Sequence, residues 1–185
     1  MFEGCSNLQH VTCLATNKSA QNCTFGWLSG VASTGTFVKA RGFNGWSTGT
    51  SGIPSNWTVI EPPKYLTMTL PEGSPTTQIS IKKQGEPVGT NIQYRVNNGE
   101  WTEWTDWDFT SSQAISVNAG NVIQWRGDNP NGLSKDYNSN YIYFEIPNEV
   151  HLSGNVMSLI DGVGKTEVIP CSYCFTGLFS NANIK

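Results

Sequence analysis

Three tryptophans occur at every third position in the stretch "EWTEWTDW", residues 100–107, with carboxylates between them. Aromatic rings can stack on the flat faces of ligands, and carboxylates accept hydrogen bonds from hydroxyl groups. The residue types therefore fit a saccharide-binding surface as well as a hydrophobic core. The distinction depends on the face of the chain that each of Trp101, Trp104 and Trp107 occupies.

A strand over residues 100–109 would separate the tryptophans, because strand side chains alternate between two faces. Trp101, Trp107 and Phe109 would share one face. We predict that this face packs into the core, since each large aromatic side chain buries ~150 to 250 Å². Trp104 would remain on the opposite, exposed face among the carboxylates.

The dipeptide Asn98-Gly99 predicts a two-residue hairpin turn, because both central positions of a type I′ turn need positive φ. Such a turn places Arg95 diagonally across from Trp104. The guanidinium can then lie on the indole ring in a cation–π contact worth ~0.5 to 2 kcal/mol. We favour this packing role for Trp104, because aromatic side chains and arginines on neighbouring strands commonly stabilise a sheet.

The alternative is a surface that binds sugar rings on the same exposed face. Tyr141 is a further candidate for stacking there. A β-bulge near Thr105 would shift the alternation and bring Trp104 and Trp107 to one face. The candidate ligand-binding residues are Trp104, Arg95, Tyr94, Asp106 and Asp108.

Other motifs have simpler structural interpretations. The tripeptide "RGD", residues 126–128, matches an integrin-binding motif, but a strand that ends at Arg and enters a Gly-Asp-Asn-Pro turn explains it better. The stretch "DNPNGLSKDYNSN", residues 128–140, gathers oxygen donors that calcium could use. Their spacing matches no EF-hand loop, so we predict a polar connecting loop whose Asp and Asn side chains cap its own turns.

Catalytic and metal-binding constellations are sparse in the sequence. Of the five cysteines, Cys171 and Cys174 have the C-x-x-C spacing, but no second pair completes a four-ligand site. Glu103 and Asp106 would lie on opposite strand faces, which argues against a glycosidase pair. We therefore predict no enzyme, no metal and no cofactor, and interpret the cysteines as small buried thiols. A carbohydrate-active enzyme remains the outside alternative.

Composition narrows the class of partner. Charged residues make up 14% of the 185-residue chain, the formal net charge is −3, and Ser, Thr and Asn total 54. No basic stripe is present to neutralise phosphates, so we predict no nucleic-acid partner. No run of 18 apolar residues occurs, so we predict no membrane insertion. A polar surface of low charge is typical of extracellular or virion proteins.

The composition and residue pattern of the chain change twice along its length. Residues 1–61 are rich in Gly, Ser, Thr and Asn and end at the proline pair in "EPPK". Residues 62–150 carry seven short alternating segments separated by turn signals. This pattern predicts an immunoglobulin-like antiparallel β-sandwich. Residues 151–185 resemble the beginning of the chain, because "GLFSNANIK" echoes "MFEGCSNLQ".

These segments resemble the BspA-like leucine-rich-repeat surface proteins of anaerobic bacteria. "MFEGCSNLQHVTCLAT" looks like one repeat, and "GTFVKARGFNGWSTGTSGIPSNWTVI" is similar to the segment that closes a repeat block. "YRVNNGEWTEW", "AGNVIQWRGDN" and "LSGNVMSLI" resemble the β-domain between blocks, and "SYCFTGLFS" resembles the first repeat of the next block. The sequence departs from the family in holding one repeat and part of another.

The resemblance implies a mainly β protein in which a sandwich is flanked by partial leucine-rich-repeat segments. A repeat buries its apolar face only against neighbours, so we expect exposed repeat edges that could support a homo-oligomer. The implied function is a non-catalytic adhesion or spacer module at the cell surface. Its partner would be a host or bacterial surface protein or a glycan. The alternative is a phage virion fibre or decoration protein completed by subunit assembly.

Overall fold

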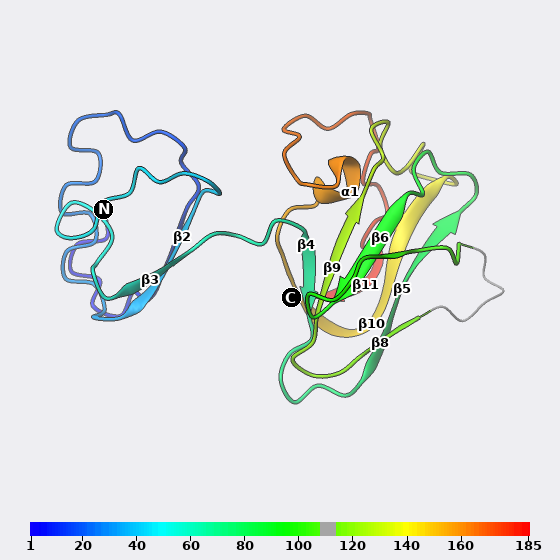
Figure 1. Cartoon of the computed structure of the whole chain (residues 1–185), viewed down its shortest axis with the longest axis horizontal. Coiled ribbons are helices and arrows are strands. Elements are labelled where there is room, and N and C mark those ends of the chain that lie inside the picture. Colours follow the sequence, from blue (N-terminus) through cyan, green and yellow to red (C-terminus); the bar gives the residue numbers. More distant parts are fainter. Residues whose placement is uncertain (108–113) are drawn as a thin grey trace. The chain divides into compact units, whose positions relative to one another are not determined.

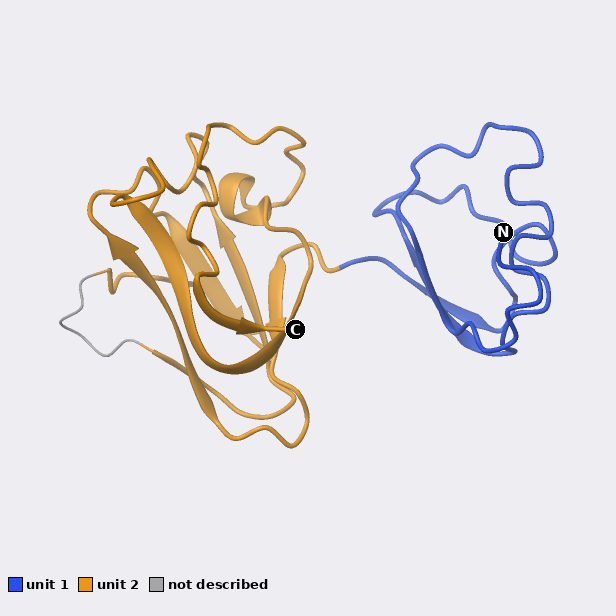
Figure 2. Ribbon diagram, turned by 180° about the vertical axis from the view of Figure 1, so that it is seen from behind, with its two compact units in different colours: residues 1–62 blue, residues 63–185 orange. Residues whose placement is uncertain are grey.

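The computed structural model describes residues 1–107 and 114–185, which form two compact units (Figures 1 and 2). Unit 1 is Met1–Pro62 and unit 2 is Pro63–Lys185. The division falls within the proline pair that the sequence indicates as a joint. Residues 151–185, which the sequence pattern indicates as a third segment, belong to unit 2.

Unit 1 contains a parallel sheet of three strands. The order across the sheet is β1 (His10–Cys13), β2 (Gly35–Lys39) and β3 (Trp57–Ile60). His10 pairs with Thr36, and Thr36 pairs with Thr58, so successive strands lie 26 and 22 residues apart. Parallel neighbours require a crossover, and here each crossover is one coil of irregular chain.

Aromatic side chains fill the space between this sheet and its coils. Trp27 packs edge-on against Phe37 at 5.9 Å between ring centroids and stacks on Trp46 at 5.4 Å. Trp27 and Trp57 also anchor the coils, because their indole N–H groups donate to the carbonyls of Gly52 and Ala32. The buried core of unit 1 consists of Val11, Trp27, Leu28, Phe37, Ile53 and Trp57.

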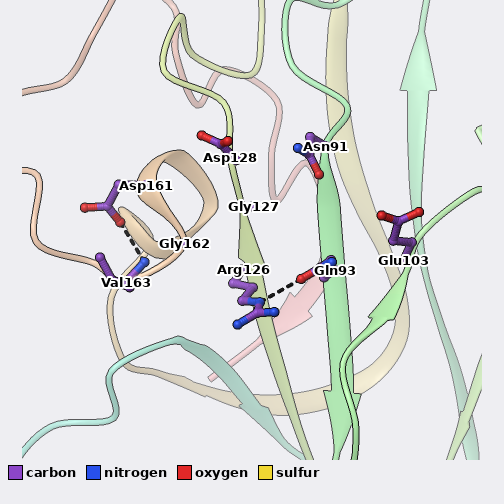
Figure 3. Close-up of a pocket in the computed structure, with 9 residues that line it drawn as sticks. All are labelled: Asn91, Gln93, Glu103, Arg126, Gly127, Asp128, Asp161, Gly162 and Val163. Carbon is purple, nitrogen blue, oxygen red and sulfur yellow. Dashed lines mark hydrogen bonds between the residues drawn. The ribbon is translucent and has the colours of Figure 1, made fainter.

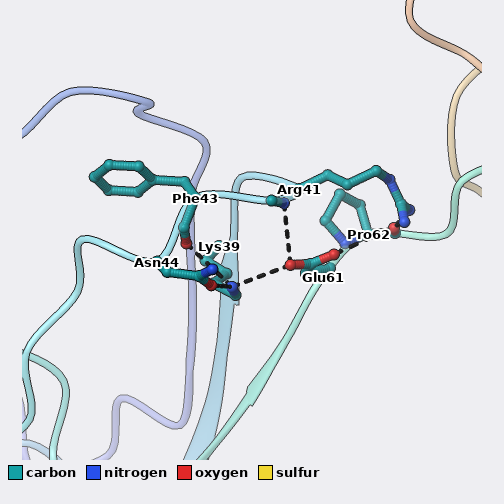
Figure 4. A network of polar contacts seen from close by, with 7 residues as sticks. Lys39, Arg41, Phe43, Asn44, Glu61 and Pro62 are labelled. Carbon is teal, nitrogen blue, oxygen red and sulfur yellow. Dashed lines mark hydrogen bonds and ion pairs between the residues drawn. The ribbon is translucent and has the colours of Figure 1, made fainter.

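A polar network fixes the end of unit 1 (Figure 4). Lys39 forms an ion pair with Glu61 at 3.0 Å and donates to the carbonyl of Phe43 and to Asn44 Oδ1. The hydrogen bond from Lys39, together with the N–H of Gly42, lowers the pKa of Glu61. The network therefore ties the end of β2 to the residue after β3.

Unit 2 is a curled sheet of eight strands, all antiparallel to their neighbours except the last (Figure 1). The hydrogen-bonded order is β7-β6-β9-β4-β10-β5-β8, and β11 pairs with β10 in parallel. The strands are β4 (Leu66–Thr69), β5 (Thr77–Gln84), β6 (Ile92–Val96), β7 (Thr102–Glu103), β8 (Ile115–Val117), β9 (Val122–Gly127), β10 (Tyr141–Ser153) and β11 (Asn181–Ile184).

The long strand β10 joins the two halves of this sheet. Its first part, Tyr141 to Glu145, pairs with β5, and its last part, His151 to Ser153, pairs with β4. The alternating segments predict a sandwich of immunoglobulin type, whereas the strands described in unit 2 form one continuous hydrogen-bonded sheet. The mainly β, antiparallel character of this region is confirmed. A strand boundary at residue 150 would cut β10, which is why residues 151–185 fold with this unit.

Alternation along the strands builds the core of unit 2. In three of the alternating segments, residues 65–70, 79–81 and 141–146, the apolar residues at every second position are buried, and these residues are Leu66, Met68, Leu70, Ile79, Ile81, Ile142, Phe144 and Ile146. Trp125 lies fully buried among them and packs edge-on against Phe144 at 4.9 Å. The short helix α1 (Ser158–Asp161) closes this core, because the Ser158 hydroxyl bridges Leu66 N–H and the carbonyl of Trp125.

The C-terminal segment repeats a backbone pattern of unit 1. Residues 22–30 form successive turns with positive φ at Asn22, Gly26 and Gly30, and residues 173–180 form the same turns with positive φ at Tyr173 and Gly177. The segment then enters β11. In the described parts of the chain, no helix has the length and apolar character needed to span a membrane.

Candidate functional site

The hairpin between β6 and β7 determines which tryptophan faces outward. Asn97 and Asn98 carry positive φ of 49° and 60°, and Gly99 N–H donates to the carbonyl of Val96. The turn is therefore centred on Asn97-Asn98, one residue earlier than predicted. Asn97 is held there by Val122 on the neighbouring strand, through its N–H at 2.8 Å and its Oδ1 at 2.9 Å.

The resulting register reverses the faces predicted for Trp101 and Trp104. Gln93 pairs with Glu103 and Tyr94 pairs with Thr102, which brings Trp101 beside Arg95. The prediction that Trp104 is exposed under an arginine is wrong, because Trp104 is only 3% exposed. A one-residue shift of register moves every side chain to the other face of a strand.

Trp104 is a core residue with its polar atom satisfied. Its ring packs edge-on against Tyr94 at 6.0 Å and at a tilt against Trp125 at 6.1 Å, and its Nε1 donates to the carbonyl of Asp106. Trp107 is half-buried against the same core, as predicted. The strand ends at Glu103, so Trp104 and Trp107 reach one face, but that face is the interior.

Trp101 takes the outward position predicted for Trp104. The Cζ atoms of Arg126 and Arg95 lie 4.2 Å and 4.7 Å from its ring centroid, and Tyr65 packs edge-on at 4.8 Å. Lys64 Nζ lies 5.0 Å from the Tyr65 ring. These five residues, Lys64, Tyr65, Arg95, Trp101 and Arg126, are called the outer cluster below.

Two glutamines hold the arginines of the outer cluster. Arg95 Nε donates to Gln124 Oε1 at 2.8 Å, and Arg126 Nε donates to Gln93 Oε1 at 2.7 Å. Each arginine lies opposite the glutamine of the other strand, because β6 and β9 pair antiparallel. No carboxylate of the described chain forms an ion pair with Lys64, Arg95 or Arg126.

A polar cavity of about 460 Å³ adjoins the outer cluster and shares Arg126 with it (Figure 3). Residues from β6, β7 and β9 line one part of it, and the end of α1 lines the other. Its polar side chains come from Asn91, Gln93, Glu103, Arg126, Asp128 and Asp161. The volume falls within the range of ~300 to 1,000 Å³ that is usual for small-ligand sites.

The "RGD" tripeptide lies at the rim of this cavity, at the end of a strand. Gly127 is buried, and a Cβ atom at this position would come within 2.5 Å of the Asn91 carbonyl and 2.6 Å of the Leu159 carbonyl. Asn129 fills the remaining space, because its Nδ2 donates to both of these carbonyls. The glycine thus lets α1 approach the sheet. The side chain of Arg126 is part of the outer cluster.

Asp161 is an acceptor for the loop that follows α1. The N–H groups of Val163, Gly164, Lys165 and Thr166 and the Thr166 hydroxyl all donate to its carboxylate. Burial alone would raise the pKa of Asp161, but these hydrogen bonds outweigh it and hold the pKa well below its ordinary value. Asp161 is therefore an ionised structural group with its oxygen atoms occupied.

The other predicted ligand-binding residues do not form one surface. Arg95 belongs to the outer cluster, whereas Tyr94 faces inward between Trp104 and Trp125. Asp106 is half-buried, and Asp108 lies outside the described residues. Tyr141 lies on β10, beside Tyr143 at 5.9 Å between ring centroids.

The polar loop at residues 128–140 is held by its own hydrogen bonds, and the cysteine pair, Cys171 and Cys174, packs at the core of unit 2. Asp136 accepts hydrogen bonds from the Asn140 side chain and from the N–H groups of residues 138–140, which lowers its pKa to about 2. This agrees with the predicted capping of its own turn. Burial raises the pKa of the Cys174 thiol to about 11, and Cys171 packs beside the same core. No group of three or more His, Cys, Asp or Glu side chains within residues 1–107 and 114–185 could hold a metal ion.

The sequence does not indicate that Lys64, Tyr65, Gln93, Trp101 and Arg126 share one outer surface, although one signal is present. "QYR" at residues 93–95 and "QWR" at residues 124–126 repeat the order Gln, aromatic, Arg. If two such segments pair antiparallel, the aromatic residues meet on one face and each arginine meets a glutamine on the other. This repeat predicts the contacts only when it is known that the two segments are neighbouring antiparallel strands.

Comparison with known proteins gives no relative from which a role could be transferred: no family model, curated protein or solved structure matches the chain.

Proposed function

We propose that the chain is a non-catalytic adhesion or spacer module of a BspA-like leucine-rich-repeat protein at the cell surface. The observation that carries this proposal is the outer cluster, in which three cations and two aromatic rings lie on one sheet face beside a polar cavity. Aromatic and Arg side chains are the residue types most enriched at binding sites. The partner would be a surface glycan or a surface protein.

The repeat part of the proposal is supported by the architecture of unit 1. Its parallel strands recur after 26 and 22 residues, a spacing in the range of leucine-rich repeats of 20 to 29 residues. The turns of residues 22–30 recur at residues 173–180. Solenoid coils at both ends of a β-domain would make the module a spacer between repeat blocks.

Binding to arrays tests the adhesion role. The labelled full-length chain is applied to mucosal glycans and to surface proteins of host and bacterial cells, beside Trp101→Ala and Tyr137→Ala. Tyr137 is an aromatic residue of unit 2 that is 62% exposed and lies outside the outer cluster, so its variant is the matched control. We expect binding that Trp101→Ala reduces and Tyr137→Ala retains. The absence of any bound glycan or protein would leave only the spacer role.

A virion fibre or decoration protein is the second candidate, with assembly through open sheet edges. Within the described residues, β1 and β3 each pair on one side only, and Val59 and Ile60 of β3 are more than 40% exposed. Open edges of this kind can pair with another chain. Light scattering coupled to size-exclusion chromatography separates the candidates, because a stable trimer or larger assembly favours the fibre and a monomer favours the spacer.

A further inference from the structure

The two guanidinium groups of the outer cluster are oriented but not neutralised. The Nε atoms of Arg95 and Arg126 donate to glutamines, and no described residue accepts a hydrogen bond from their Nη atoms. Each guanidinium therefore keeps donors in a fixed fork, which matches the geometry of carboxylate and sulfate groups. The side chains are half-buried, so little conformational freedom remains to be lost on binding.

The local charge also favours an anion at this place. Lys64, Arg95 and Arg126 bring three positive charges to one face of a chain whose net charge is −3. Charge–ring contacts with Tyr65 and Trp101 hold these groups but do not cancel their charge. An acidic ligand would supply the missing counter-charge.

The adjoining cavity has a different chemistry. Asn91, Gln93, Glu103 and Asp128 offer amide and carboxylate groups, which suit the hydroxyl groups of a sugar ring. The carboxylates repel a negative group placed deep in the cavity. An acidic group is favoured only beside Arg126, which belongs both to the cavity and to the outer cluster. In Figure 3 this side chain lies at a distance from Asn91 and Asp128.

We propose that the outer cluster and the polar cavity together bind a saccharide that carries a carboxylate or sulfate group. The acid group lies on the free donors of Arg95 and Arg126, and the sugar hydroxyls enter the cavity. This assignment rests on the proposed adhesion function and specifies its ligand class. An acidic peptide would satisfy the arginines equally well, but it would leave the hydroxyl-binding side chains of the cavity unused.

Calorimetric titration of the full-length chain at low salt with four probes tests the proposal. The probes are 3′-sialyllactose, 3′-sulfated lactose, neutral lactose and a tetraglutamate peptide. We expect one or both acidic sugars to bind at least about ten-fold more tightly than lactose and the peptide, with affinity that falls as salt is added. Equal affinity for acidic and neutral sugars, or preference for the peptide, would overturn the assignment.

Charge variants locate the site. Arg95→Gln and Arg126→Gln should each weaken binding of the acidic sugar by about ten-fold or more, and Lys135→Gln, at an exposed lysine outside both surfaces, should leave it unchanged. Near-ultraviolet circular dichroism checks that each variant is folded. If a variant unfolds, the comparison of acidic with neutral sugar on the unmodified chain still decides.

The two proposals can fail separately. If the array detects a partner but no acidic sugar binds in the titration, the adhesion role survives and the acidic-saccharide assignment is wrong. If acidic sugars bind and both glutamine variants bind as tightly as the unmodified chain, the ligand class is right and its placement on the outer cluster is wrong.

Discussion

Trp101 and Trp104 are three residues apart and of one type, but they have different environments. Trp104 is enclosed by Tyr94 and Trp125, whereas Trp101 lies outside, beside Arg95 and Arg126. The stability of unit 2 should therefore depend on the first residue, and binding should depend on the second.

Alanine substitution at these two positions should separate the two roles. We expect Trp104→Ala to lower the free energy of unfolding by ~3 to 5 kcal/mol, because it leaves a cavity in the core. Trp101→Ala should lower it by only ~0.5 to 2 kcal/mol, the value of its cation–π contacts. Urea unfolding followed by tryptophan fluorescence measures both. A larger loss for Trp101→Ala than for Trp104→Ala would contradict the assigned register.

At the scale of elements, the conformation of the β6–β7 hairpin is coupled to its pairing with β9. Asn97 closes the turn and bonds to Val122 through both its backbone and its side chain. The antiparallel pairing of β6 with β9 then places each arginine beside a glutamine. Local turn geometry thereby fixes the composition of a surface that spans three strands.

Substitutions of Asn97 test this dependence. Asn97→Ala should destabilise unit 2 by ~1 to 3 kcal/mol, since it loses a hydrogen bond and a Cβ-bearing residue other than Asn or Asp disfavours positive φ. Asn97→Gly loses the same hydrogen bond but tolerates the backbone angle, so it should cost less. Chemical denaturation gives both values. Equal losses would show that the positive φ contributes nothing.

At the scale of the whole molecule, hydrogen-bonded carboxylates determine how the stability of the fold changes at acid pH. Hydrogen bonds lower the pKa of Glu61 in unit 1 and of Asp136 and Asp161 in unit 2. A carboxylate with a lowered folded pKa contributes stability above its unfolded pKa of ~4 and loses it as pH falls toward the folded value. Stability should therefore decrease with acidification.

We expect the urea midpoint to be nearly constant from pH 7 to pH 5 and to fall steadily from about pH 4 toward pH 2.5. Asp161→Asn should start from a lower midpoint at pH 7 and show a shallower fall, because it cannot gain a proton. An unchanged slope in Asp161→Asn would rule out Asp161 as a contributor.

The sequence by itself determined the β class and the inward sets on individual strands. Leu66, Met68 and Leu70 stand at alternate positions of one such segment and are all buried, since alternation along one strand is a local property. It also indicated the division of the chain at the proline pair, and it predicted that the loop around Asp136 is polar. Only the tertiary structure decided which tryptophan lies outside the core and which arginines accompany it. A turn displaced by one residue reverses both faces of a strand, and the neighbour of that strand is chosen by packing across the whole sheet.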